Sequence, residues 1–127
     1  MQSRFKIKNI SVIIPVYNSA DTIVSLHRRI VSVLMELVVD YEIIFINDAS
    51  MDKSLDIIYS LSKKDENIKY INLNKNFGQH NALLCGIRHA KYDFIVTMDD
   101  DLQNPPEEIP KLLEKIDRGY DVVNQTT

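Results

Sequence analysis

The sequence predicts an α/β fold, in which a mostly parallel sheet carries helices on both faces. Three observations lead to this prediction. Short runs of β-branched and aromatic residues alternate with segments whose apolar residues recur every three or four positions. The strand-like runs are apolar almost throughout, as parallel strands are when both of their faces are buried. The length of 127 residues fits a single domain.

Four runs are predicted to be strands, because β-branched and aromatic residues dominate them. They are Ile10–Val16, Tyr41–Ile46, Ile68–Leu73 and Asp93–Met98, and Tyr120–Val123 is a candidate fifth strand. Apolar stripes with helical spacing fill the intervals, at Ile23–Leu37, Leu55–Leu61, Leu83–Ala90 and Ile109–Ile116. Strands and helices that alternate in this way build a Rossmann-like parallel sheet with right-handed crossovers.

The helix boundaries are predicted from capping and turn residues. Ser50 precedes the second helical stripe and is expected to cap that helix. Pro105–Glu108 suits the first turn of the fourth helix, because proline and acidic residues are favoured there. Pro110 is tolerated only within that opening turn, so the helix can begin a residue or two later. Gly119 is expected to end it.

The composition excludes several classes of protein. The net charge is −3 and no basic block is present, so a nucleic-acid partner is not expected. The single cysteine, Cys85, excludes an internal disulfide and is expected to be a small buried apolar residue. No apolar run reaches the roughly 20 residues of a membrane helix. We therefore expect a cytoplasmic protein, or one at the cytoplasmic face of a membrane that it contacts only through parts outside this chain.

The segments around and after the ends of the predicted strands are rich in polar residues. Ligands of open α/β sheets bind beyond the carboxyl ends of the strands, so these residues are candidates for a binding site. They are Pro15, Val16, Tyr17, Asn18 and Ser19 after the first strand, Asn47, Asp48, Ala49 and Ser50 after the second, Asn74–Gly78 after the third, and Asp99–Gln103 after the fourth.

Three adjacent carboxylates make the fourth segment the most informative. On an extended segment Asp99 and Asp101 project to one side, with Gln103, while Asp100 points away. Carboxylates this close repel one another unless a cation neutralises them, and hard oxygen ligands suit Mg²⁺ or Mn²⁺. The alternative is a solvated acidic loop that caps the following helix. No G-x-G-x-x-G follows the first strand and no phosphate-binding G-K-S/T is present, which removes two standard nucleotide motifs.

Four segments together resemble a known family. They are Ser11–Asn18 (SVIIPVYN), Tyr41–Asp52 (YEIIFINDASMD), Asn76–Leu83 (NFGQHNAL) and Met98–Glu107 (MDDDLQNPPE). In this order and spacing they resemble glycosyltransferase family 2, and most closely its branch that transfers sugars to polyprenyl phosphates, such as dolichol phosphate. The resemblance covers the chain from about Ile10 onward. It implies a GT-A fold, with residues 1–127 as the N-terminal, nucleotide-sugar-binding part of a catalytic domain truncated at its C-terminus.

The resemblance also implies roles for individual residues. The nucleotide sugar, linked to UDP or GDP, is expected to contact Pro15, Tyr17, Asn18, Asn47, Asp48, Asn76, Gly78, Asp99 and Asp100. The metal ligands are expected to be Asp99 and Asp101, which match the D-x-D carboxylates, and Gln103, which matches a further ligand of the polyprenyl-phosphate branch. The metal itself is expected to be Mg²⁺ or Mn²⁺.

Three positions depart from the family pattern. Ser19 stands where Glu is common, Asn47 stands where the first of two Asp residues is common, and Ala49 replaces the glycine of the usual Asp-Gly-Ser turn. An asparagine carbonyl still accepts a hydrogen bond from a base N–H but carries no charge. A positive φ at Ala49 would be less comfortable than at glycine.

The activity implied is an inverting transfer of a sugar from a nucleotide diphosphate to a polyprenyl phosphate or a cell-envelope glycan. A general base, if one is needed, is expected beyond Thr127, so this chain alone is expected to be inactive. A non-catalytic relative that binds the nucleotide sugar and metal is the main alternative. A response-regulator receiver domain is disfavoured, because its acidic residues are missing after the first and third strands. Pairing of two chains through an exposed sheet edge is a further hypothesis.

Overall fold

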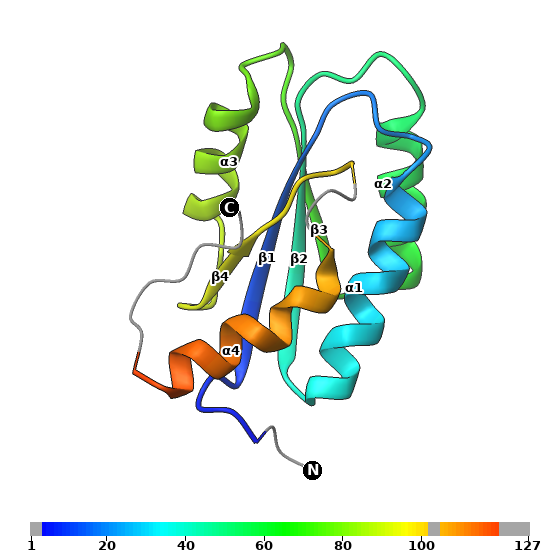
Figure 1. The fold of residues 1–127 in the computed structure, drawn as a ribbon. Helices are drawn as coiled ribbons and strands as arrows, with labels where there is room; N and C mark the ends of the chain where they lie inside the picture. The colour runs from blue at the N-terminus through cyan, green and yellow to red at the C-terminus, as the bar shows by residue number, and fades with distance from the viewer. Residues whose placement is uncertain (1–3, 102–104, 120–127) are drawn as a thin grey trace.

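The computed structural model describes residues 4–101 and 105–119. Its elements are β1 (Asn9–Val16), α1 (Ile23–Leu37), β2 (Asp40–Asn47), α2 (Ser54–Lys64), β3 (Ile68–Asn72), α3 (Gln79–Arg88), β4 (Ile95–Thr97), the 3-10 turn η1 (Pro106–Glu108) and α4 (Ile109–Asp117). The four strands form one sheet in the order β3-β2-β1-β4, and every neighbouring pair is parallel (Figure 1). The predicted α/β fold is therefore confirmed.

The strand register aligns the carboxyl ends of the three longer strands. Val16 at the end of β1 pairs with Asn47, and Asn47 pairs with Asn72 at the end of β3. The shorter β4 pairs with β1 only as far as Thr97, which lies opposite Ile13. The loops that follow β1, β2 and β3 consequently start side by side, and the segment after β4 starts three residues lower along β1.

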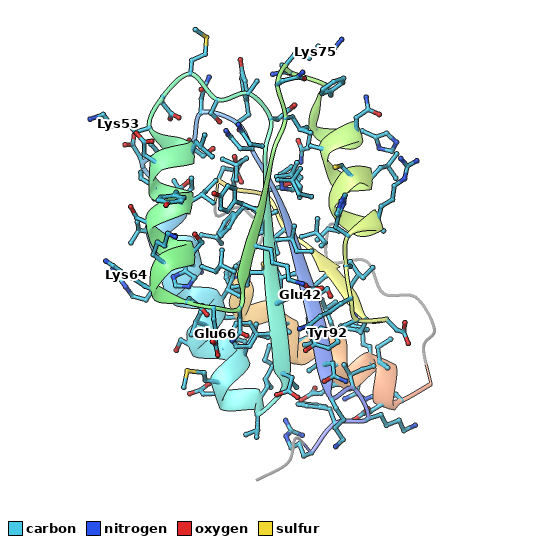
Figure 2. All side chains as sticks on the ribbon, turned by 180° about the vertical axis from the view of Figure 1, so that it is seen from behind. Glu42, Lys53, Lys64, Glu66, Lys75 and Tyr92 are labelled. Atoms are coloured by element: carbon cyan, nitrogen blue, oxygen red, sulfur yellow. The ribbon has the colours of Figure 1, made fainter. Side chains whose placement is uncertain are left out.

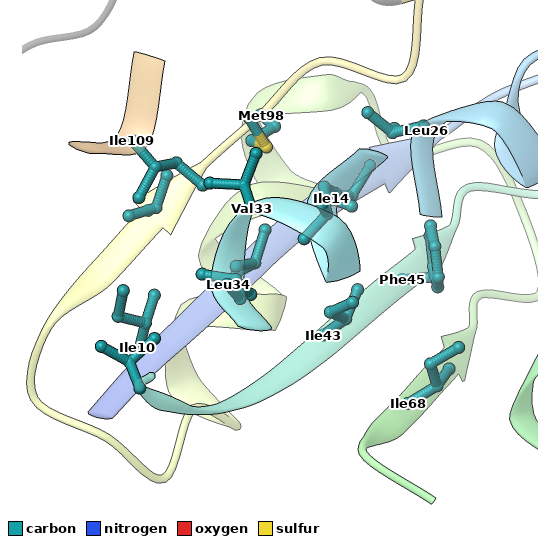
Figure 3. Close-up of a cluster of buried hydrophobic side chains, with 14 of the residues drawn as sticks. Ile10, Ile14, Leu26, Val33, Leu34, Ile43, Phe45, Ile68, Met98 and Ile109 are labelled. Carbon is teal, nitrogen blue, oxygen red and sulfur yellow. The ribbon is translucent and has the colours of Figure 1, made fainter. Parts of the chain in front are cut away.

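Helices cover both faces of the sheet. On one face, the apolar stripes of α1, α2 and α4 pack on β1, β2 and β4 in a single cluster of buried side chains. Figure 3 shows part of this cluster, with Ile14 of β1 and Phe45 of β2 beneath Leu26 and Leu34 of α1. On the other face, α3 is the one helix of the described residues that packs on the sheet, in a smaller cluster that contains Ile13, Ile44, Ile46 and Ala82.

The close approach of α3 to the sheet depends on Gly86. A Cβ atom at this position would lie 2.5 Å from Cγ2 of Ile13 and 2.5 Å from Cδ1 of Ile46, well inside van der Waals contact. Any side chain here would therefore push α3 away from β1 and β2. The position of α3 matters for function, because its first turn borders the pocket described below.

Several predicted boundaries need correction. Ser50 does not cap α2, which begins at Ser54; instead Oδ1 of Asp52 accepts the backbone N–H of Ser54. The fourth strand is shorter than predicted, and the candidate fifth strand, Tyr120–Val123, lies outside the described residues. The start of α4 at Ile109 and the stop at Gly119, where φ is +103°, agree with the sequence patterns. Within the described ranges, no helix is long and apolar enough to cross a bilayer.

A buried carboxylate ties the amino end of the sheet together. Glu42 of β2 is 1% exposed, and its Oε2 accepts the Ser11 hydroxyl and the Lys91 backbone N–H, each at 2.6 Å. Its Oε1 lies 2.9 Å from Nζ of Lys69. Burial by itself raises the pKa of Glu42, but these hydrogen bonds together outweigh it, so the pKa lies below its ordinary value. Figure 2 shows Glu42 in the interior beside Tyr92, towards the end of the molecule opposite Lys75.

One helix end is strained. Val38 follows α1 with φ = +56° and ψ = +47°, the left-handed conformation that glycine usually supplies after a helix. A β-branched residue is an outlier in this region, because its side chain crowds the backbone. The Val38 side chain is 37% exposed, so its partial burial offsets little of that strain.

Candidate functional site

A pocket of about 290 Å³ opens at the carboxyl edge of the sheet. Its walls come from four separate segments of the chain. The lining residues are Pro15, Val16, Tyr17, Asp48, Asn76, Gly78, Gln79 and Asp100. Six of them were predicted as nucleotide-sugar contacts from the sequence, and the crossovers of the fold bring them together. Tyr17 lines the pocket and is 48% exposed, so a ligand can reach this residue.

Asp48 holds one wall of the pocket in place. The residue is only 3% exposed, and its two carboxylate oxygens accept the backbone N–H groups of Phe77 at 2.8 Å and Gly78 at 2.9 Å. Hydrogen bonds from two N–H groups to one carboxylate fix the loop that leads into α3. Gly78 adopts φ = +92° there, a conformation that L side chains rarely reach. The hydrogen bonds to Asp48 and the positive φ of Gly78 thus together define the conformation of this loop.

The loops after β1 and β2 are also joined. The N–H of Asn18 donates to Oγ of Ser50 at 3.0 Å, and Oδ1 of Asn18 accepts the N–H of Met51 at 2.7 Å. Ala49, the residue before Ser50, has φ = +59°. The positive φ that is less comfortable for alanine than for glycine is therefore present in this turn. The Asn18 side chain faces the neighbouring loop and does not line the pocket.

Asn47 serves the sheet edge. It is 2% exposed, and its Nδ2 donates to Oδ1 of Asn72 at 2.8 Å, which ties the ends of β2 and β3. Its Oδ1 accepts the N–H of Ser50 at 3.4 Å. The structure therefore does not bring the Asn47 side chain into the pocket, although the sequence pattern grouped it with Asp48.

The acidic triplet is arranged differently from the extended segment that the sequence suggested. Asp100 and Asp101 lie in a turn, so alternation of side chains does not apply to them. Asp100 faces the pocket: its Oδ2 accepts the N–H of Tyr17 at 3.0 Å and also the hydroxyl of Ser19. The expectation that Asp100 points away is therefore wrong, because hydrogen bonds from the loop after β1 turn it inward. Oδ1 of Asp99 accepts Nε2 of Gln79 at 2.8 Å.

The chemistry of the triplet fits a hard divalent cation. Carboxylate oxygens are the ligands that Mg²⁺ and Mn²⁺ prefer, and one or two carboxylates are enough when phosphate oxygens complete the shell. Among the described residues, no three His, Cys, Asp or Glu side chains form a ready-made metal cluster. Gln103, the third predicted ligand, lies outside the described residues.

Sequence reasoning missed two features of the site. Gln79, the first residue of α3, lines the pocket and contacts Asp99. Ser19 was a candidate through its place after the first strand, but the hydrogen bond from its hydroxyl to Asp100 was not predicted. Position at the carboxyl edge could also have indicated Gln79, but the partners of both residues depend on how the loops fold over one another.

Comparisons with known proteins agree with this geometry. The sequence model of Glycosyl transferase family 2 matches residues 11–127. An undecaprenyl-phosphate 4-deoxy-4-formamido-L-arabinose transferase of Photorhabdus laumondii is 44% identical over 119 residues, which cover 93% of this chain and 37% of the relative. The chain thus spans little more than a third of the length of that curated relative.

Solved structures share the fold. TarS of S. aureus (residues 1–349) superimposes with a TM-score of 0.70 at 24% identity, over 87% of this chain and 32% of that protein. The mannosyltransferase PcManGT of Pyrobaculum calidifontis, in complex with GDP-Man and Mn²⁺, superimposes with a TM-score of 0.72 at 19% identity, over 97% of this chain and 34% of that protein. TarS has also been solved with UDP.

Proposed function

Because this chain belongs to glycosyl transferase family 2, we propose that it is the donor-binding part of an inverting glycosyltransferase that moves a sugar from a nucleotide diphosphate to a polyprenyl phosphate. The observation that carries the proposal is the pocket where Tyr17, Asp48 and Asp100, from three separate segments, meet beside the rest of the acidic triplet. The GT-A fold of the solved neighbours supports the same assignment.

The nucleoside is proposed to bind between the loop after β1 and the loop that Asp48 holds. Pro15 and Tyr17 offer an apolar surface against which a base and ribose can pack. Asp48 already accepts two N–H groups, and a carboxylate has further lone pairs for a third donor from the base. Solved neighbours carry UDP or GDP-Man, so both bases remain candidates for this chain.

The diphosphate is proposed to lie near Asp99 and Asp101, with Mg²⁺ or Mn²⁺ held by these two residues and by Gln103. A divalent cation there neutralises charge on the departing nucleoside diphosphate. Asp100 is engaged by Tyr17 and Ser19, so its proposed role is to fix the turn and to contact the nucleotide sugar.

The acceptor is proposed from the curated relative, whose name specifies an undecaprenyl phosphate. A lipid phosphate is anionic and already nucleophilic, so it needs little help from a base; a glycan hydroxyl would need a general base, expected beyond Thr127. With such an acceptor, we propose that the full-length enzyme works at the cytoplasmic face of a membrane. Pairing of two chains through an exposed edge of the sheet stays a hypothesis, which light scattering tests.

The proposal is tested by titration calorimetry of the protein with UDP and GDP, with and without Mn²⁺. We expect metal-dependent binding of one of them, weakened about tenfold or more by Asp101→Asn, the scale seen when partners in metal sites are lost. Asp93→Asn, an exposed carboxylate on the opposite edge of the sheet, is the matched control. Absence of binding of both nucleotides, with Mn²⁺ as well as without it, would reject the proposal. Transfer assayed with polyprenyl phosphate separates an enzyme from a non-catalytic relative.

A further inference from the structure

A second hollow lies on the outer side of α3, away from the donor pocket. It has a volume of about 370 Å³, and we call it the α3 groove. Its lining residues are Leu73, Phe77, Asn81, Leu84, Cys85, Arg88 and His89. Phe77, just before α3, and Leu84, on α3, are 41% and 40% exposed and line the same hollow, so two large apolar side chains are open to solvent at one place. Cys85 is only partly buried, so the expectation that it is a small buried residue is wrong.

The segment of the chain that carries the groove is basic. Residues 67–92 contain four Lys or Arg side chains and no Asp or Glu, although the whole chain has a net charge of −3. Lys69 is paired with Glu42, but Arg88 lines the groove, and Nζ of Lys75 lies 5.0 Å from the centre of the Phe77 ring. A basic rim around exposed apolar side chains complements a surface that is both anionic and apolar beneath.

The groove and the donor pocket share one loop. The backbone N–H of Phe77 donates to Asp48 in the pocket, while the Phe77 ring lines the groove. Gly78, the next residue, lines the pocket. Whatever the groove contacts therefore lies within a residue or two of the donor site.

We infer that the α3 groove docks this domain on an anionic lipid bilayer, with Lys75 and Arg88 at the headgroups and Phe77 and Leu84 inserted between them. The choice of a bilayer rests on the proposed function, because a lipid-phosphate acceptor has to be met at a membrane surface. An acidic protein partner would satisfy the charges as well, and it is distinguished by the experiment below.

Cys85 provides a local probe, since it is the single cysteine and lines the groove. The purified protein is labelled there with an environment-sensitive fluorophore and titrated with vesicles of phosphatidylcholine, alone or mixed equally with phosphatidylglycerol. We expect a blue shift and binding with the mixed vesicles, and release by added salt. The same label on Met35→Cys in a Cys85→Ser background reports from α1, on the other face of the sheet, and is expected not to shift.

Charge reversal tests the rim. Lys75→Glu/Arg88→Glu is expected to lower the vesicle partition coefficient about tenfold or more, since each basic residue near an anionic surface contributes roughly 1 kcal/mol. The control, Lys53→Glu/Lys64→Glu, makes the same change in charge at two exposed positions, the residue before α2 and the last residue of α2, away from Lys75 (Figure 2). It is expected to lower partition by no more than about twofold, as long-range electrostatics are screened.

The outcomes separate the inference from the proposed function. Three results would each overturn the bilayer inference. The first is an equal loss of vesicle partition in the two double variants, and the second is binding with no preference for anionic vesicles. The third is a blue shift with soluble polyglutamate but not with vesicles. Nucleotide titration is run in parallel on every variant. Nucleotide binding without vesicle binding would reject the groove inference and leave the proposed function intact. Vesicle binding without nucleotide binding would reject the proposed function and leave the docking of the groove on vesicles intact.

Discussion

The interaction between Asp48 and the loop before α3 allows a quantitative test of the pocket. Asp48→Asn keeps the shape of the side chain but replaces one carboxylate oxygen by an NH₂ group. In the native protein both oxygens accept backbone N–H groups, from Phe77 and Gly78. The asparagine can accept only one of them, and its NH₂ group must face the other donor.

The expected loss of stability follows from the changes to these two hydrogen bonds. A hydrogen bond to a charged group contributes about 1.5–3 kcal/mol, and one such bond disappears while the other loses its charge. Asp48 is 3% exposed, so water cannot readily take its place; of the two donors only the Gly78 N–H has a second acceptor among the described residues, Oδ1 of Asn76 at 3.0 Å. We expect the free energy of unfolding to fall by about 2–3 kcal/mol. We also expect amide exchange at Phe77 and Gly78 to accelerate about tenfold or more, since 1.36 kcal/mol corresponds to a factor of ten.

Urea unfolding followed by circular dichroism measures the first quantity, as the chain has no tryptophan, and NMR-detected hydrogen exchange measures the second. Asp93→Asn removes the same charge from an exposed position and is expected to change neither by more than about 0.5 kcal/mol. If exchange at Phe77 and Gly78 were unchanged in Asp48→Asn, the loop would not depend on this carboxylate and the reasoning would be refuted.

Three further predictions concern packing, strain and pH. Gly86→Ala should destabilise the fold by about 1–3 kcal/mol despite the higher helix propensity of alanine, because the new Cβ meets Ile13 and Ile46 at 2.5 Å; an equal or higher urea midpoint would contradict this. Val38→Gly should stabilise the protein by about 1 kcal/mol by relieving the left-handed strain, measured as a higher melting temperature. The folded-state pKa of Glu42 lies below its ordinary value of 4.5. The ionised Glu42 therefore contributes fully to the free energy of unfolding above pH 4.5, and this contribution is lost as pH falls through the folded-state pKa. Glu42→Gln should therefore lose less stability than the wild type over that acidic interval in urea titrations, and identical pH profiles would exclude the effect.

The sequence was sufficient for the fold class because its signal is local and repeated. In the apolar run at Ile10–Val16 and the helical stripe at Ile23–Leu37, almost every residue predicted to be buried is buried in the structure. Boundaries were less certain where several polar residues compete for one role. Ser50 and Asp52 both precede α2, and only the folded loop makes Asp52 the residue that accepts the Ser54 N–H.

The order of residues along the chain determined which side chains can reach the carboxyl edge, since in a parallel sheet every segment after a strand emerges there. It also determined the chemistry available, through the carboxylates of Asp48 and Asp99–Asp101. Only the tertiary structure decided where these groups point. Asp100 turns inward because the N–H of Tyr17, far away in sequence, donates to it, and Asn47 turns to Asn72 because β3 pairs beside β2. Such hydrogen bonds join segments that no local pattern relates, so their directions exist only once the sheet has formed.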